Sequence, residues 1–133
     1  MRRLEKALQV LQQSSKLTYE ELISNDVLLS AIERNLQVAI ECVLDIGNHI
    51  IAEKGFENPD DNEDIIRILG SEGIVPSDFA ESIKGIAGFR NILVHEYTGI
   101  DYGLLYNYLV NRLDDFRQFA RYISAYLERE ASL

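Results

Sequence analysis

The stretch from Asp26 to Lys54 constrains the fold more than any other part of this 133-residue chain. Apolar residues recur in it at alternating spacings of three and four, which predicts one long amphipathic helix. We expect Asn25 or Asp26 to cap its start and Gly55 to end it. A second apolar stripe beside the first predicts packing against more than one neighbour. The first stripe is Leu29, Ile32, Leu36, Ala39, Val43, Ile46 and Ile50, and the second adds Ile40, Leu44 and Ile51.

Helical signals also fill the rest of the chain. A leucine face predicts a helix over residues 2–15, and Thr18-Tyr19-Glu20-Glu21 has the form of a capping box that starts a short one. Further helices are expected over residues 63–71, from Ser77 as a cap to the Thr98-Gly99-Ile100 break, and over residues 102–129 after Asp101 as a cap. No strand period or internal repeat is present. The prediction is one all-α domain over residues 1–133, an antiparallel bundle of four main helices with short additional ones.

The charge balance limits the partners. The chain holds 22 acidic and 13 basic residues, a net charge of −9. A broad nucleic-acid surface needs an excess of lysine and arginine, so an RNA-binding function would require a local basic pocket in an acidic body. The sequence has no apolar run of membrane-spanning length and no signal-peptide pattern, and Cys42 is its only cysteine. We therefore expect a cytoplasmic protein without a membrane association.

Metal and cofactor signals are weak. Residues 53–64 hold six acids, but the spacing does not match a calcium loop and predicts an exposed turn. Two histidines and one cysteine, with no close His-His or Cys-His pair, do not suggest a zinc site. No glycine-rich nucleotide fingerprint occurs, since Gly85, Gly88 and Gly99 fit neither known pattern. We expect no cofactor and no metal.

The segment Arg90–Tyr97 carries the chemistry. Arginine holds a phosphate with two parallel hydrogen bonds, and histidine moves a proton near neutral pH. Arg90 and His95 together are the minimum needed to cleave a phosphodiester without a metal. The structural alternative is that both residues cap the carbonyl end of their helix. Tyr97 has two interpretations as well, a half-buried lid or an exposed group open to modification.

The spacing around Arg90 favours a specific partner for it. Arg90 follows Ile86 by four residues and so lies on or beside an apolar face, where a charge is costly without a partner. A bound anion would serve, as would Glu41 or Asp45 of the long helix. Residues five apart differ by about 140° around an ideal helix, so Arg90 and His95 do not stack. Either the helix loosens before His95, or the two side chains meet over a groove, or a second chain completes the site.

Other polar and small residues have simpler explanations. His49 follows Asp45 by four residues, which suggests a local ion pair or hydrogen bond. Gly85 and Gly88 suggest a close approach of another backbone or of a substrate. The tyrosines of the last predicted helix could stack bases, but most are more simply core or interface residues. They are Tyr102, Tyr106, Tyr108, Tyr122 and Tyr126.

The motif in its helical context resembles a known family. Arg90, four residues, His95, one residue and Tyr97, inside an all-helical chain of this length, resembles the HepT-like toxins of the HEPN superfamily. The segment from Ala31 to Ile40 and the Gly88-Phe89-Arg90-Asn91 approach to the motif are similar as well. The resemblance covers nearly the whole chain and implies a HEPN-like fold.

The resemblance implies a metal-independent endoribonuclease toxin that acts as a homodimer, with Arg90 and His95 of both chains in one cleft. The 2′-hydroxyl of RNA would be the nucleophile, and Asn91 would support His95 or the phosphate. The implied partner is an MNT-type nucleotidyltransferase antitoxin that adenylylates Tyr97. One rival hypothesis is a non-catalytic binding subunit that presents substrate to a nucleotidyltransferase. The other is a structural dimer in which the motif only caps a helix.

Overall fold

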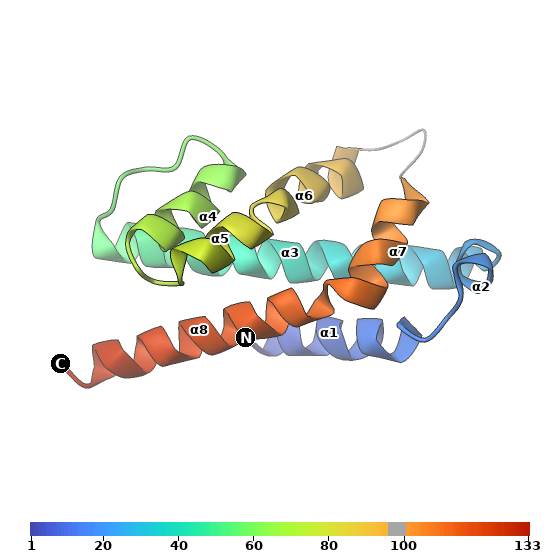
Figure 1. The fold of residues 1–133 in the computed structure, drawn as a ribbon, viewed down its shortest axis with the longest axis horizontal. Coiled ribbons are helices and arrows are strands. Elements are labelled where there is room, and N and C mark those ends of the chain that lie inside the picture. The colour runs from blue at the N-terminus through green and yellow to red at the C-terminus, as the bar shows by residue number, and fades with distance from the viewer. Residues whose placement is uncertain (96–100) are drawn as a thin grey trace.

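Helices make up nearly all of the structure (Figure 1). A computed structural model describes residues 1–95 and 101–133, without the side chains of residues 94 and 95. The described part contains α-helices and no strand, which confirms the all-α prediction. The elements are α1 (Arg2–Ser14), α2 (Tyr19–Ile23), α3 (Asp26–Lys54), α4 (Asn62–Ser71), α5 (Ser77–Ile83), α6 (Gly85–His95), α7 (Tyr102–Asn111) and α8 (Leu113–Ala131).

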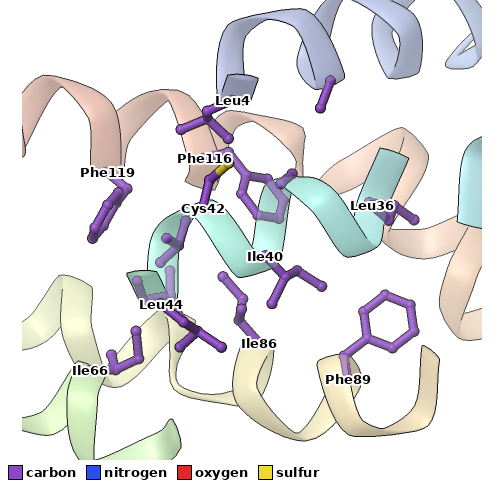
Figure 2. Packing of buried hydrophobic residues seen from close by; sticks show 14 of the residues in the cluster. Leu4, Leu36, Ile40, Cys42, Leu44, Ile66, Ile86, Phe89, Phe116 and Phe119 are labelled. Atoms are coloured by element: carbon purple, nitrogen blue, oxygen red, sulfur yellow. The ribbon is translucent and has the colours of Figure 1, made fainter. Parts of the chain in front are cut away.

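The long helix α3 is the centre of the fold. In Figure 1, α4, α5 and α6 lie along one side of it, and α1 and α8 lie along the other. Figure 2 shows the consequence inside the core: Leu4 and Phe116 meet α3 from one side, and Ile86 and Phe89 meet it from the other. All four side chains are buried. The predicted packing of α3 against several neighbours is therefore confirmed.

Most predicted helix ends are confirmed by their capping bonds. The Thr18 hydroxyl accepts from the Glu21 amide at 3.1 Å, and the Glu21 carboxylate accepts from the Thr18 amide at 3.0 Å. Asn25 is the cap of α3, since its Oδ1 accepts from the Leu28 amide at 3.1 Å. Gly55 ends α3 with φ at 71°, in the left-handed region that favours glycine. Asp101 caps α7 in the same way as Asn25 caps α3.

Two predicted long helices are each broken in two. The helix expected from residue 77 divides at Lys84 into α5 and α6, and the helix expected over residues 102–129 divides at Arg112 into α7 and α8. One contact joins both breaks: the Arg112 Nη2 donates to the Ser82 carbonyl at 3.0 Å. Carbonyls in the last turn of a helix have no partner within it, so this donor stabilises the end of α5. The assignment of Ser77 as a cap is also wrong, because Pro76 holds that position and no side chain caps α5.

Close helix contacts occur at glycines other than those expected. A Cβ on Gly47 would lie 2.7 Å from a methyl carbon of Ile65, and one on Gly70 would lie 2.7 Å from the Cβ of Ala80. These two glycines let α4 pack closely on α3 and on α5. The predicted close approach of another backbone at Gly85 and Gly88 is wrong, since a Cβ at Gly88 would meet nothing within 4 Å.

The acidic segment is an exposed turn, as predicted. It runs from Gly55 to Asp61, where the Asp61 carboxylate caps α4. Arg67 bridges Glu57 and Asp64, and its hydrogen bond to Asp64 lowers the pKa of that carboxyl. Among residues 1–95 and 101–133, no cluster of histidine, cysteine and acidic side chains is arranged to hold a metal ion. In the same ranges no helix combines the length and hydrophobicity needed to cross a membrane.

Candidate functional site

Helix α6 carries the motif as far as His95. Its first half is fixed to the core by Ile86 and Phe89, which are 1% and 3% exposed. The Phe89 ring stacks on Tyr108 of α7 with 4.3 Å between ring centroids and 20° between the planes. Because Phe89 precedes Arg90 directly, this packing determines where the Arg90 backbone lies. Sequence reasoning missed Phe89 as an anchor, although its aromatic side chain was a signal.

Arg90 lies beside the apolar face of α6, as predicted. Its Nε is 3.8 Å from Oε1 of Glu41 on α3, and each side chain is 29% exposed. Of the two acids considered as partners, the structure selects Glu41 rather than Asp45. Partly exposed ion pairs contribute only about 0.2–1 kcal/mol, and this one is at the long end of the distance range. Glu41 therefore orients the guanidinium without binding it tightly.

A short row of contacting polar side chains runs from Gln37 through Glu41 and Arg90 to Asn91. Gln37 Nε2 donates to the same Glu41 Oε1 at 3.2 Å, and Arg90 Nη1 donates to Asn91 Oδ1 at 3.4 Å. The structure thus brings Asn91 to Arg90, and it adds Gln37, which sequence reasoning did not select. Its spacing of four residues before Glu41 was the available signal. The row leaves Arg90 with donors that a phosphate can still use.

The positions of Arg90 and His95 are set by α6 itself. The helix runs without a break from Gly85 to His95, so the expectation of a loosened helix before His95 is wrong. Around such a helix, positions 90 and 95 lie about 140° apart. The other two alternatives, a meeting over a groove and completion by a second chain, remain. Tyr97 lies outside the described residues.

The tyrosines considered for base stacking are mostly part of the core. Tyr108 and Tyr126 are 4% and 7% exposed, and burial raises the pKa of both phenols. The Tyr106 hydroxyl donates to the Leu17 carbonyl at 2.6 Å, and Tyr122 packs edge-on against Phe79. These contacts support the core interpretation.

His49 makes a local contact with a carboxylate one turn away, as its spacing suggested, but with a different partner. Its Nε2 lies 3.2 Å from Oε2 of Glu53, one turn further along α3, rather than near Asp45. Its side chain is 77% exposed. His49 therefore belongs to the surface of α3, and nothing in its surroundings links it to the motif.

Comparison with known proteins places this arrangement in a family. The profile described as Ribonuclease HepT-like matches residues 4–123. The chain belongs to the HepT-like family. Among HepT-like relatives, the mRNA nuclease HepT of Shewanella oneidensis is 30% identical over 68% of each chain. The tRNA nuclease HepT of Aphanizomenon flos-aquae is 31% identical over 80% of this chain and 77% of its own.

Solved structures support the same HepT-like fold. A tri-AMPylated HEPN toxin of Shewanella oneidensis, in complex with an MNT antitoxin, superposes with a TM-score of 0.83. The superposition covers 93% of this chain and 92% of the toxin, at 24% identity. At that identity the likeness establishes the fold alone. It confirms the HEPN-like architecture expected from the motif and the helix pattern.

Proposed function

We propose that this chain is an endoribonuclease toxin of a toxin–antitoxin pair and that it cleaves RNA without a metal ion. Two relatives that cover more than two thirds of the chain are named mRNA and tRNA nucleases. The observation that carries the proposal is the state of Arg90: it is half-buried, anchored through Phe89 and, within the described residues, oriented by one weak carboxylate contact. Such a guanidinium is ready to exchange that contact for a phosphate.

In the proposed reaction the nucleophile belongs to the substrate. The ribose 2′-oxygen attacks the adjacent phosphorus and gives up its proton to a general base, while the 5′-oxygen of the next nucleotide leaves and takes a proton from a general acid. The products are a 2′,3′-cyclic phosphate and a 5′-hydroxyl. His95 is assigned to proton transfer, and Arg90 to the charge that builds on the phosphate oxygens. Asn91 supports this geometry through its contact with Arg90.

The helix geometry favours a site made by two chains. Because positions 90 and 95 lie about 140° apart around an ideal α-helix, and α6 includes both, they do not share one face of it. In a homodimer, Arg90 of one chain can act with the other chain's His95. One histidine would then serve as base and the other as acid.

Regulation is proposed to act through Tyr97. An MNT-type nucleotidyltransferase antitoxin would transfer AMP to its hydroxyl. The added phosphate would bring negative charge to the motif and compete with RNA for the Arg90 guanidinium. The AMPylated state of the Shewanella oneidensis toxin supports this part of the proposal. Co-expression with the antitoxin should raise the intact mass of the wild-type chain and leave Tyr97→Phe unmodified.

The test of the proposed activity is His95→Ala with His49→Ala as its matched control. Loss of general acid–base help lowers rates by roughly 10²–10⁴-fold, so His95→Ala should reduce RNA cleavage by that factor. His49 is the only other histidine and is exposed on α3, so its removal should leave cleavage unchanged. The measurement is single-turnover cleavage of a labelled RNA in the presence of a chelator.

Other outcomes select the rival functions. Cleavage by His95→Ala at the wild-type rate contradicts the assignment of His95. Purified wild-type protein that cleaves no RNA but binds a nucleotidyltransferase tightly supports the binding subunit. A change in stability without a change in function on Arg90→Ala supports a purely structural motif.

A further inference from the structure

A groove lies between α1 and α3, apart from the surroundings of Arg90. It has a volume of about 360 Å³, and its polar lining consists of Arg3, Lys6, Gln9 and Asn35. Val10 and Val38 supply its apolar walls. Among the described residues, none that lines it is acidic. Nothing in the proposed mechanism uses this groove.

The groove has the opposite charge to the body of the protein. Residues 1–16 contain Arg2, Arg3, Lys6 and Lys16 against Glu5 alone, a net charge of +3. Subtracting this from the total of −9 leaves −12 on residues 17–133. Because the whole chain has a net charge of −9, any RNA-binding function requires a local basic pocket. This groove meets that requirement, and the surroundings of Arg90, with Glu41 as a neighbour, do not meet it alone.

The cations of the groove are available to a ligand. Arg3 and Lys6 are exposed, and neither forms an ion pair with any residue in ranges 1–95 and 101–133. They are three residues apart on α1, which places their Cβ atoms about 5–6 Å apart on one face. Asn35 Nδ2 donates to the Ala31 carbonyl at 2.8 Å, which leaves its Oδ1 as an acceptor. The groove thus offers two cations and a hydrogen-bond acceptor side by side.

The groove and Arg90 lie on two flanks of one stripe of α3, in which Arg34 and Asp45 are exposed and Val38 and Glu41 are partly buried. Val38 lines the groove, and Glu41, three residues later, contacts Arg90. Three residues correspond to about 4.5 Å along a helix. Arg34, which is exposed, precedes Val38 by one turn on the same stripe. The groove and the Arg90–Glu41 contact therefore lie within about one helical turn of each other along α3, and one strand can reach both.

We propose that this groove binds the sugar–phosphate backbone of the RNA substrate at nucleotides outside the scissile linkage. Arg3 and Lys6 bind phosphate oxygens, and Asn35 Oδ1 accepts a hydrogen bond from a ribose hydroxyl. The inference rests on the proposed nuclease function for the identity of the ligand. An RNA strand fits better than an acidic protein because the groove continues the stripe that leads to Arg90.

The test compares RNA binding by Arg3→Gln/Lys6→Gln with binding by Lys16→Gln/Arg129→Gln. Both pairs remove two positive charges, and Lys16 and Arg129 are exposed residues outside the groove. His95→Ala is present in every protein to prevent cleavage. The measurement is fluorescence anisotropy of a labelled single-stranded RNA over a series of salt concentrations, with helix content and thermal unfolding as checks of folding.

Each phosphate contact on a single strand changes the slope of log affinity against log salt by about 0.7. At roughly 0.1 M salt, this corresponds to about a fivefold change in RNA affinity. The groove variant, Arg3→Gln/Lys6→Gln, should therefore bind RNA about 25-fold more weakly, with the salt slope reduced by about 1.4. The control pair should bind like the parent. Equal losses in the two pairs, or no loss in the groove variant, would overturn the proposal.

Two further outcomes keep the groove and the nuclease function distinct. In proteins that retain His95, the groove variant should raise KM for RNA and leave kcat unchanged. If the wild-type chain cleaves no RNA and the groove variant still loses RNA affinity, the nuclease function fails and the groove stands. If the groove variant keeps its RNA affinity but loses binding to the nucleotidyltransferase partner, the groove is a protein-binding site and this proposal fails.

Discussion

The cations on the two flanks of α3 differ in their burial and in their contacts with carboxylates. On the flank facing α6, Arg90 is half-buried and has Glu41 at 3.8 Å and Asn91 at 3.4 Å. On the flank facing α1, Arg3 and Lys6 are exposed and contact no carboxylate among the described residues. One helix thus separates an oriented cation from two exposed cations that form no ion pair among the described residues.

Under the proposed nuclease function, the difference matches two tasks in catalysis on RNA. A group that stabilises the transition state must be held in place before the reaction, because its reorganisation would add to the barrier. A group that only attracts the strand gains from exposure, because it releases counterions and tolerates many geometries. We therefore assign the α6 flank to the rate of the chemical step and the α1 flank to affinity.

Of the variants that compare the two flanks, Arg90→Ala should produce the largest effect. Removal of one transition-state donor typically costs about 10²–10³-fold in kcat, while the RNA affinity contributed by Arg3 and Lys6 is retained. Single-turnover cleavage at saturating RNA measures the change in kcat. Arg129→Ala, on the exposed surface of α8, is the control. A loss of RNA affinity with an unchanged kcat would remove the distinction between the two flanks.

Val38→Glu should give the α1 flank the carboxylate that it lacks. Val38 lines the groove with Arg3 and Lys6, so a glutamate there can pair with either cation. Loss of one or two phosphate contacts predicts RNA binding that is about 5- to 25-fold weaker. In Val38→Gln the new side chain has nearly the same size as glutamate but no charge, so this variant should bind RNA close to the wild-type affinity. Equal anisotropy curves for the two variants would show that charge in the groove is irrelevant.

Glu41→Gln should have the smallest effect, and in the opposite direction. It removes a carboxylate that competes with phosphate for Arg90. An ion pair of this exposure contributes about 0.2–1 kcal/mol, so KM for RNA should fall by no more than about fivefold. Asp45→Asn, one turn further along the same stripe of α3, is the control for net charge. If both variants lower KM equally, the Arg90–Glu41 contact has no specific role.

Much of the fold follows from local sequence signals. Capping side chains and the left-handed Gly55 are local features, and the stripes of α3 have a clear period, so helix ends at Thr18, Asn25 and Gly55 were predictable. The breaks at Lys84 and Arg112 were not predictable from local signals, and the contact that joins them is a bond from Arg112 to Ser82, thirty residues away. The apolar period continues through both breaks and conceals them.

The candidate site was predictable to a similar degree. The motif indicated Arg90 and Asn91, and the position of Arg90 beside an apolar face required a partner such as Glu41. The α1–α3 groove was not predictable, because it depends on α1 lying against α3 so that Arg3 and Lys6 line one groove with Asn35. The functional roles of Arg90, Asn91, His95 and Tyr97 stay predictions.

The central claim is that a guanidinium and an imidazole cleave RNA with its own 2′-hydroxyl as nucleophile. The most direct measurement compares a labelled RNA with the same strand carrying one 2′-deoxyribose at the cleavage position, both in excess chelator. The account predicts that the RNA is cut to a 2′,3′-cyclic phosphate and that the substituted strand is not cut at that position. Cleavage of the 2′-deoxy linkage, or activity that disappears with chelator and returns with magnesium, would contradict it.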